Sequence, residues 1–243
     1  ASGVHHPLLA EAATQFQARA IAEMFPPGGP VKTQVIGKVT DKKLEQAQRV
    51  QDFMNYQVTQ EIPDYFNELD QMLFYLALAG SAFKKVYFDN TLDRICSKFV
   101  PAEDFVISME NTDLETAERY TQVMKLTRND IRKYQISGVY KDIPLTKSEA
   151  GGSGSNNDGD MVEQTIQRLE GMSPSMADKI HTILEVHTNL DLGEDKNELA
   201  LPYIVTIDYE SQQVLSIRRN WKEEDTLRRK RTYFIHYKYL PGL

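Results

Sequence analysis

Residues 72–88 decide the fold, because they join two kinds of secondary structure: Met72-Leu-Phe-Tyr-Leu-Ala-Leu-Ala-Gly80-Ser-Ala-Phe-Lys-Lys-Val-Tyr-Phe88. The apolar residues before Gly80 have helical spacing, and the residues after it are typical of a strand. Glycine adopts the left-handed backbone conformation that commonly ends a helix with little strain. We therefore predict a helix from Pro63 to Ala79, ended by Gly80, and a strand over Ala82–Phe88.

Two more helices are predicted upstream of this junction. Residues 6–25 carry apolar side chains at three- and four-residue spacing, and Pro26-Pro-Gly-Gly-Pro30 ends that helix because proline has no N–H to donate. A short extended piece, Val31–Val39, follows. A second helix is predicted over about Lys42–Gln60, capped by Thr40 or Asp41. Its apolar stripe consists of Leu44, Ala47, Val50, Met54 and Val58.

Downstream of the junction, strands alternate with short helices. We predict that Asp93–Val100 pairs with Ala82–Phe88 as a hairpin. Thr127-Arg-Asn-Asp130 resembles a capping box and opens a helix that stops at Gly138. A further short helix is predicted over Asp160–Glu170. The remaining predicted strands are Phe105–Ser108 and Tyr120–Leu126, followed by Ile180–Leu192 and then an antiparallel meander of Tyr203–Tyr209, Gln213–Arg219 and Thr232–Tyr239.

This order predicts an α+β fold, with N-terminal helices followed by an antiparallel or mixed β-sheet with short helices, rather than repeated βαβ units. We divide the chain into residues 1–147, a helical segment with a first β-rich part; residues 148–160, a flexible loop; and residues 161–243, a short helix with the meander. Within the loop, Gly151-Gly-Ser-Gly-Ser155 has the composition of an engineered linker or of a natural flexible tip, and both predict disorder.

The composition is that of a globular protein, with 41% hydrophobic and 26% charged residues. No apolar run approaches the ~18–20 residues of a membrane span, so we expect no membrane association. We find no secretory signal, and the start at Ala1 fits a processed chain or one that begins inside a longer one. Cys96 is the only cysteine, which excludes an internal disulfide and fits a reducing cytoplasm; we interpret it as a small apolar core residue.

The sequence offers little chemistry. It contains no GxxxxGK[ST], HExxH or G-x-S-x-G motif and no GxGxxG after a strand. His181 and His187 would share a strand face about 20 Å apart at ~3.3 Å per residue, too far for one metal ion; His5-His6 is read as a solvated tail. The acidic pairs Asp64/Glu68 and Glu223-Glu224 are interpreted as solvated faces. We predict no catalytic residue, cofactor or metal and expect no enzyme; the alternative is an unrecognised carboxylate site.

Charge is distributed unevenly along the chain. From Ile217 onward there are eight bases and three acids, a balance of +5, whereas the first 216 residues hold 20 bases and 32 acids, a balance of −12. The candidate contact residues for a neighbouring subunit or DNA are Arg218, Arg219, Lys222, Arg228, Arg229, Lys230 and Arg231. With Tyr233, Phe234 and Tyr237 they have the composition of a platform for single-stranded nucleic acid. The alternatives are a hairpin with basic exposed ends and core-facing aromatics, or ion pairing between subunits.

The junction resembles the portal (head–tail connector) proteins of tailed phages, above all those of short-tailed phages. Two segments that follow it extend the resemblance, namely Phe99-Val-Pro-Ala-Glu-Asp-Phe-Val106 and Leu126-Thr-Arg-Asn-Asp-Ile-Arg132. The opening helix looks like the N-terminal helical segment of that family. Asn220-Trp-Lys-Glu-Glu224 and Tyr233-Phe-Ile-His-Tyr-Lys-Tyr-Leu-Pro-Gly242 look like the stretch that leads into its stem.

The resemblance implies a structural subunit of a ring, usually a dodecamer, at one vertex of the capsid. Double-stranded DNA passes through such a ring during packaging and ejection, and its partners are terminase, capsid and tail proteins. The implied location is the virion, after synthesis in the host cytoplasm. The chain resembles the wing region of the family and is too short to include stem, clip and crown as well. The alternative function is a nucleic-acid-binding module that uses a basic, aromatic C-terminal hairpin.

Overall fold

The computed structural model describes residues 7–89, 92–108, 111, 113–144, 180–193 and 199–239. Within these residues the chain forms four α-helices and two antiparallel sheets, which confirms the predicted α+β class. The chain divides into two compact units: Ala1–Phe105 with Thr232–Leu243, and Val106–Arg231. The predicted loop at 148–160, the helix Asp160–Glu170 and His5-His6 lie outside the described residues.

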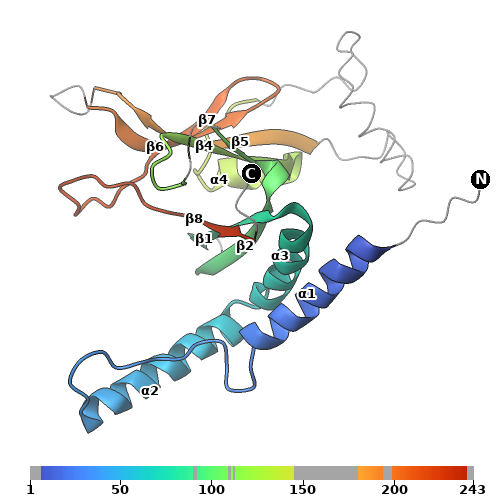
Figure 1. Cartoon of the computed structure of the whole chain (residues 1–243). Helices are drawn as coiled ribbons and strands as arrows, with labels where there is room; N and C mark the ends of the chain where they lie inside the picture. Colours follow the sequence, from blue (N-terminus) through green and yellow to red (C-terminus); the bar gives the residue numbers. More distant parts are fainter. Residues whose placement is uncertain are drawn as a thin grey trace, which may run out of the picture. The chain divides into compact units, whose positions relative to one another are not determined.

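The first unit contains the helices α1 (Leu8–Met24), α2 (Asp41–Tyr56) and α3 (Tyr65–Ala79), and a π-helical turn η1 (Gln57–Glu61) follows α2. Figure 1 shows α1 beside α3, with α2 extending away from the end of α3. The core consists of four residues of α3 and one of the next strand, against which Phe16 and Ala20 of α1 pack; its members are Leu69, Met72, Leu73, Leu76 and Ala82.

The predicted junction is confirmed. Gly80 ends α3 with a left-handed φ of 73°, and its N–H donates to the carbonyl of Leu76 at 2.9 Å. The chain then enters β1 (Ser81–Asp89), which pairs antiparallel with β2 (Arg94–Pro101) from Asp89↔Arg94 to Ala82↔Pro101. A positive φ at this position explains why the sequence has glycine there.

The first sheet has the order β2-β1-β8, where β8 is Phe234–Lys238. The prediction that Thr232–Tyr239 continues the C-terminal meander is therefore wrong, because β8 pairs with β1 in the register Ser81↔Lys238 to Lys85↔Phe234. Alternation of apolar residues specifies a strand but not its partner, and β1 has a second edge that must also be paired.

The second sheet has the order β3-β4-β5-β6-β7. Its strands are β3 (Phe105–Ile107, after the short 3₁₀ turn η2 at Ala102–Asp104), β4 (Arg119–Thr127), β5 (Ile180–Leu190), β6 (Leu201–Asp208) and β7 (Val214–Arg219). The consecutive antiparallel pairing of β5, β6 and β7 confirms that part of the predicted meander.

Helix α4 (Arg128–Ile136) packs on the second sheet and begins as predicted. The Thr127 hydroxyl accepts a hydrogen bond from the Asp130 N–H at 3.2 Å and donates one to the Asp130 carboxylate at 2.7 Å. These bonds hold the pKa of Asp130 below its usual range. Gly138, with φ 76°, follows the helix. The core of this unit is formed by Ile131, Tyr140, Ile183 and Leu215.

Candidate functional site

The seven basic candidate residues all lie in the unit Val106–Arg231, at the end of β7 and in the loop after it. Five of their side chains are exposed, whereas Arg228 and Lys230 are partly buried. The guanidinium of Arg219 lies over the Trp221 ring, 5.8 Å from its centroid, and Trp221 packs edge-on against Tyr203. The exposed members are Arg218, Arg219, Lys222, Arg229 and Arg231.

Lys230 binds backbone carbonyls of its own chain. Its Nζ donates to the carbonyls of Leu114, Glu115 and Ala117, each at 3.2 Å, and lies 5.4 Å from the Tyr120 ring centroid. An ammonium group has three protons, so these bonds use its full donor capacity. Burial also lowers the pKa of Lys230. We conclude that Lys230 anchors the loop before β4.

Arg218 and Arg229 also have partners within this unit. Arg229 Nε donates to the Asp225 carboxylate at 2.9 Å, and this contact holds the pKa of Asp225 below its usual range. Arg218 lies 3.7 Å from the buried carboxylate of Glu185, which also contacts His187 Nε2 at 3.0 Å. Arg218, Arg229 and Lys230 therefore carry charge that the fold already compensates in part.

The predicted basic and aromatic hairpin does not form. β7 pairs with β6 and β8 pairs with β1, so the two strands belong to different sheets and to different compact units. Phe234 is 2% exposed and packs edge-on against Phe105, and Tyr237 packs on the core of α3. Rings buried in a core cannot stack on bases. The prediction of core-facing aromatics is thus confirmed for Phe234.

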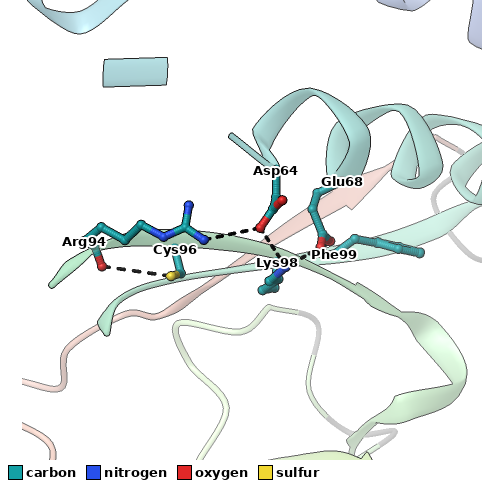
Figure 2. Close-up of polar contacts among 6 residues, drawn as sticks. All are labelled: Asp64, Glu68, Arg94, Cys96, Lys98 and Phe99. Carbon is teal, nitrogen blue, oxygen red and sulfur yellow. Dashed lines mark hydrogen bonds and ion pairs between the residues drawn. The ribbon is translucent and has the colours of Figure 1, made fainter. Parts of the chain in front are cut away.

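A network of ion pairs fastens the start of α3 to β2 (Figure 2). Lys98 Nζ lies 2.8 Å from the Glu68 carboxylate and 3.5 Å from that of Asp64, and Arg94 lies 3.5 Å from Asp64. Glu68 also accepts the Phe99 N–H at 2.7 Å. Because β2 is the edge of its sheet, this bond satisfies a backbone donor that would otherwise face outward.

The interpretation of Asp64/Glu68 as a solvated face is therefore wrong for Glu68, whose side chain is 19% exposed and paired. The hydrogen bond with Glu68 raises the pKa of Lys98. A signal for this network exists in the sequence: two acids four residues apart on a helix, and two bases four residues apart on the strand that packs beside it.

Two other residues of the β1–β2 hairpin, Cys96 and Lys84, are buried. Cys96 is buried, as predicted for a core residue, and burial raises the pKa of its thiol. Lys84 is 2% exposed and was not singled out from the sequence. Its Nζ lies 3.7 Å from the Tyr65 ring centroid and has no hydrogen-bond partner in the described part of the chain. Burial lowers the pKa of Lys84 to about 8.

The first unit also contains a cavity. A cavity of about 420 Å³ lies among α1, the turn after it, η1 and α3; it is lined mainly by Met24, Phe25, Pro26, Val31, Val58, Tyr65 and Leu69. Among the residues that the structure describes, no group of three or more His, Cys, Asp or Glu side chains is placed to hold a metal ion. No helix in that part of the chain has the length and apolar content to cross a membrane.

No protein-family model matches the sequence, and no curated protein matches it.

Proposed function

We propose that this protein is a structural subunit of a phage portal ring, at the capsid vertex where DNA is packaged and ejected and where head and tail join. On this proposal the described residues belong to the wing region. The subunit has no catalytic role of its own, and terminase, capsid and tail proteins are its partners. The support comes from the three segments that resemble portal proteins.

Each of these segments forms a joint between elements in the fold. Met72–Phe88 contains the end of α3, Gly80 and nearly all of β1. Phe99–Val106 contains the end of β2, the turn η2 and the start of β3. Leu126–Arg132 contains the end of β4, the threonine that caps α4, and the start of α4. Backbone geometry constrains the sequence where one element ends and the next begins. A series of such segments that resembles portal proteins therefore supports the same order and arrangement of elements. This is the observation that carries the proposal.

The charges also suit a conduit for DNA. Each phosphate that a protein neutralises adds affinity, and a channel that held DNA tightly would slow its passage. The body of the chain is acidic, and Arg218, Arg229 and Lys230 are among the basic candidates that have partners in their own unit. We propose that the exposed bases contact neighbouring subunits or the capsid rather than DNA.

The test is negative-stain imaging of the native protein, including any native sequence that flanks residues 1–243. Rings of about a dozen copies with a central hole are the expected result. Uniform monomers at micromolar concentration would overturn the proposal. Binding of short single strands by such monomers, with a steep dependence on salt, would favour the nucleic-acid-binding alternative instead.

A further inference from the structure

Helix α2 presents apolar side chains that the described residues of its own chain leave exposed. None of its residues is buried. One side is held to the extended piece before it: Asn55 Oδ1 accepts the Val31 N–H at 2.9 Å, and the Thr33 hydroxyl donates to the Ala47 carbonyl at 2.9 Å. Another side carries Val50, Phe53 and Met54, all exposed and spaced to share one face. We call these three residues the arm stripe; Phe53 is 57% exposed.

The first sheet also has an apolar surface that remains exposed among the residues in the structure's described ranges. Ala82, Lys84, Val86 and Phe88 alternate onto one face of β1, and Ala82 lies in the core under α3. α3 packs on the Ala82–Lys84 half of that face, where Ala82 lies among its core residues and the Lys84 ammonium lies over the Tyr65 ring. Beyond it are exposed side chains that the register places together, with Phe88 opposite Ile95 and Lys84 opposite Ile235. We call Val86, Phe88, Ile95 and Ile235 the sheet patch; Phe88 is 56% exposed.

The two surfaces match in size and in the charges beside them. Val50–Met54 rises about 6 Å along a helix, and Val86–Phe88 about 7 Å along a strand. Arg49 is one turn before Phe53, and Lys43 is on the same side of α2, whereas Asp41, Glu45 and Asp52 are on the opposite side. The β1–β2 hairpin ends beside the patch and carries Asp89 and Asp93 there. The basic residue at that end, Arg94, pairs with Asp64.

α2 of one copy is not placed to cover the patch of the same copy. Figure 1 shows that α2, which leads into η1, extends away from β1 and β2. Its hydrogen bonds to Val31 and Thr33 hold it to the extended piece before it. A head-to-tail ring, by contrast, needs two different complementary surfaces on every copy. The arm stripe and the sheet patch form such a pair within one compact unit.

We propose that the arm stripe of one copy packs on the sheet patch of the next copy, where α2 extends the helical layer that α3 begins. A sheet with an apolar face is stable when a second layer covers it, and a helix is the layer that this face already has. The choice of a second copy as occupant rests on the proposed portal function, because it is the ring that brings identical chains together head to tail.

The test is cross-linking between two populations of the full native protein. Each carries Cys96→Ala and one new cysteine, Phe53→Cys in one population and Phe88→Cys in the other. Disulfide-linked pairs are expected when the populations are assembled together and not when either is assembled alone. The matched control pairs Phe88→Cys with Glu45→Cys, an exposed position on the side of α2 opposite the arm stripe, and should give no link. A link in the control equal to that of the test pair would overturn the inference.

A charge exchange tests the same contact without cysteines. Phe53→Glu and Phe88→Lys should each weaken association at least tenfold, and the chain that carries both should recover part of the loss. Circular dichroism and melting temperature check that each variant folds; if Phe53→Glu does not fold, Phe53→Ser replaces it. Native-like rings from both single variants would overturn the inference and leave the portal proposal intact.

The two proposals can fail separately. If the native protein forms no rings but the Phe53→Cys and Phe88→Cys populations still link to each other, the portal proposal is overturned and the contact is supported. Rings without the link would overturn the contact alone. Monomers without the link would overturn both.

Discussion

Helices α3 and α2 belong to the same compact unit and both carry apolar residues at helical spacing, but only one of them has a core. α3 buries Leu69, Met72, Leu73 and Leu76, whereas α2 buries none of its 16 residues. The comparison shows that an apolar stripe predicts a helix and a need for burial, but not where the covering surface comes from. In α3 it comes from the chain itself.

The difference follows from how each helix is fastened. Gly80 turns α3 directly into β1, and Glu68 binds the edge of β2, so two neighbouring elements fix the position of α3. In the part of the chain that the structure describes, α2 is joined to the π-helical turn η1 at one end and to Val31 and Thr33 by side-chain hydrogen bonds. Single helices of this length are marginal in water unless one face is packed.

The largest effect is expected in the core of α3. Met72→Ala removes a side chain that is 0% exposed and should lower the free energy of unfolding by about 3 kcal/mol, as cavities in cores do. Urea denaturation measures this change. The matched control is Met54→Ala on α2, where a 42% exposed side chain should change the free energy by less than about 0.5 kcal/mol at a protein concentration where the chain is monomeric. Equal losses in the two variants would break the comparison.

A second effect concerns the buried ammonium beneath the first turn of α3. The pKa of Lys84 is lowered from 10.5 to about 8 in the fold, so the unfolded chain binds more protons between these values. Stability therefore rises with pH across that window and is lowest, for this group, below pH 8. Lys84→Met removes the buried charge and should stabilise the protein by about 2 kcal/mol at pH 7.

The measurement is the difference in unfolding free energy between Lys84→Met and the native protein from pH 7 to 11. This difference should shrink toward zero as the pH passes 10.5, and ionising tyrosines largely cancel in it. A difference that stays constant over the window would show that Lys84 ionises normally.

Local chemistry explains which parts of this fold the sequence predicts. Gly80 and the Thr127–Asp130 box determine their own backbone geometry through contacts a few residues away, and both were predicted correctly. The partner of β8 depends on which sheet edge is unpaired, and that is a property of the whole fold. The same holds for Lys84, since two adjacent lysines on a strand must face opposite sides and the sequence alone does not identify the buried one.

The candidate site was predicted less well, for a related reason. Seven basic residues close together in sequence suggest one exposed surface, but some of them bind partners within the fold instead. Lys230 is held by carbonyls more than a hundred residues earlier in the chain, and Arg218 by the buried Glu185. Such contacts join residues far apart in sequence. Composition therefore located the charge and could not tell which bases the fold uses for itself.

The smallest effect on the isolated subunit is expected at the arm stripe. Phe53→Ser should change the unfolding free energy by less than about 0.5 kcal/mol at a protein concentration where the chain is monomeric, because Phe53 touches no core. The same substitution in α1, Phe16→Ser, is the matched comparison. Phe16 packs on the core of α3 and edge-on against Tyr239, so its loss should cost about 3 kcal/mol at every concentration.

Protein concentration then separates a surface that is merely exposed from one that has a partner. Association stabilises the folded chain by mass action, so the melting temperature of the native protein should rise with concentration. The Phe53→Ser variant should match the native protein at low concentration and fall below it as the concentration rises, whereas Phe16→Ser should stay lower by a constant amount. Parallel curves for native protein and Phe53→Ser would mean that α2, unlike α3, needs no covering surface, and the comparison of the two helices would then reduce to a difference in solvent exposure.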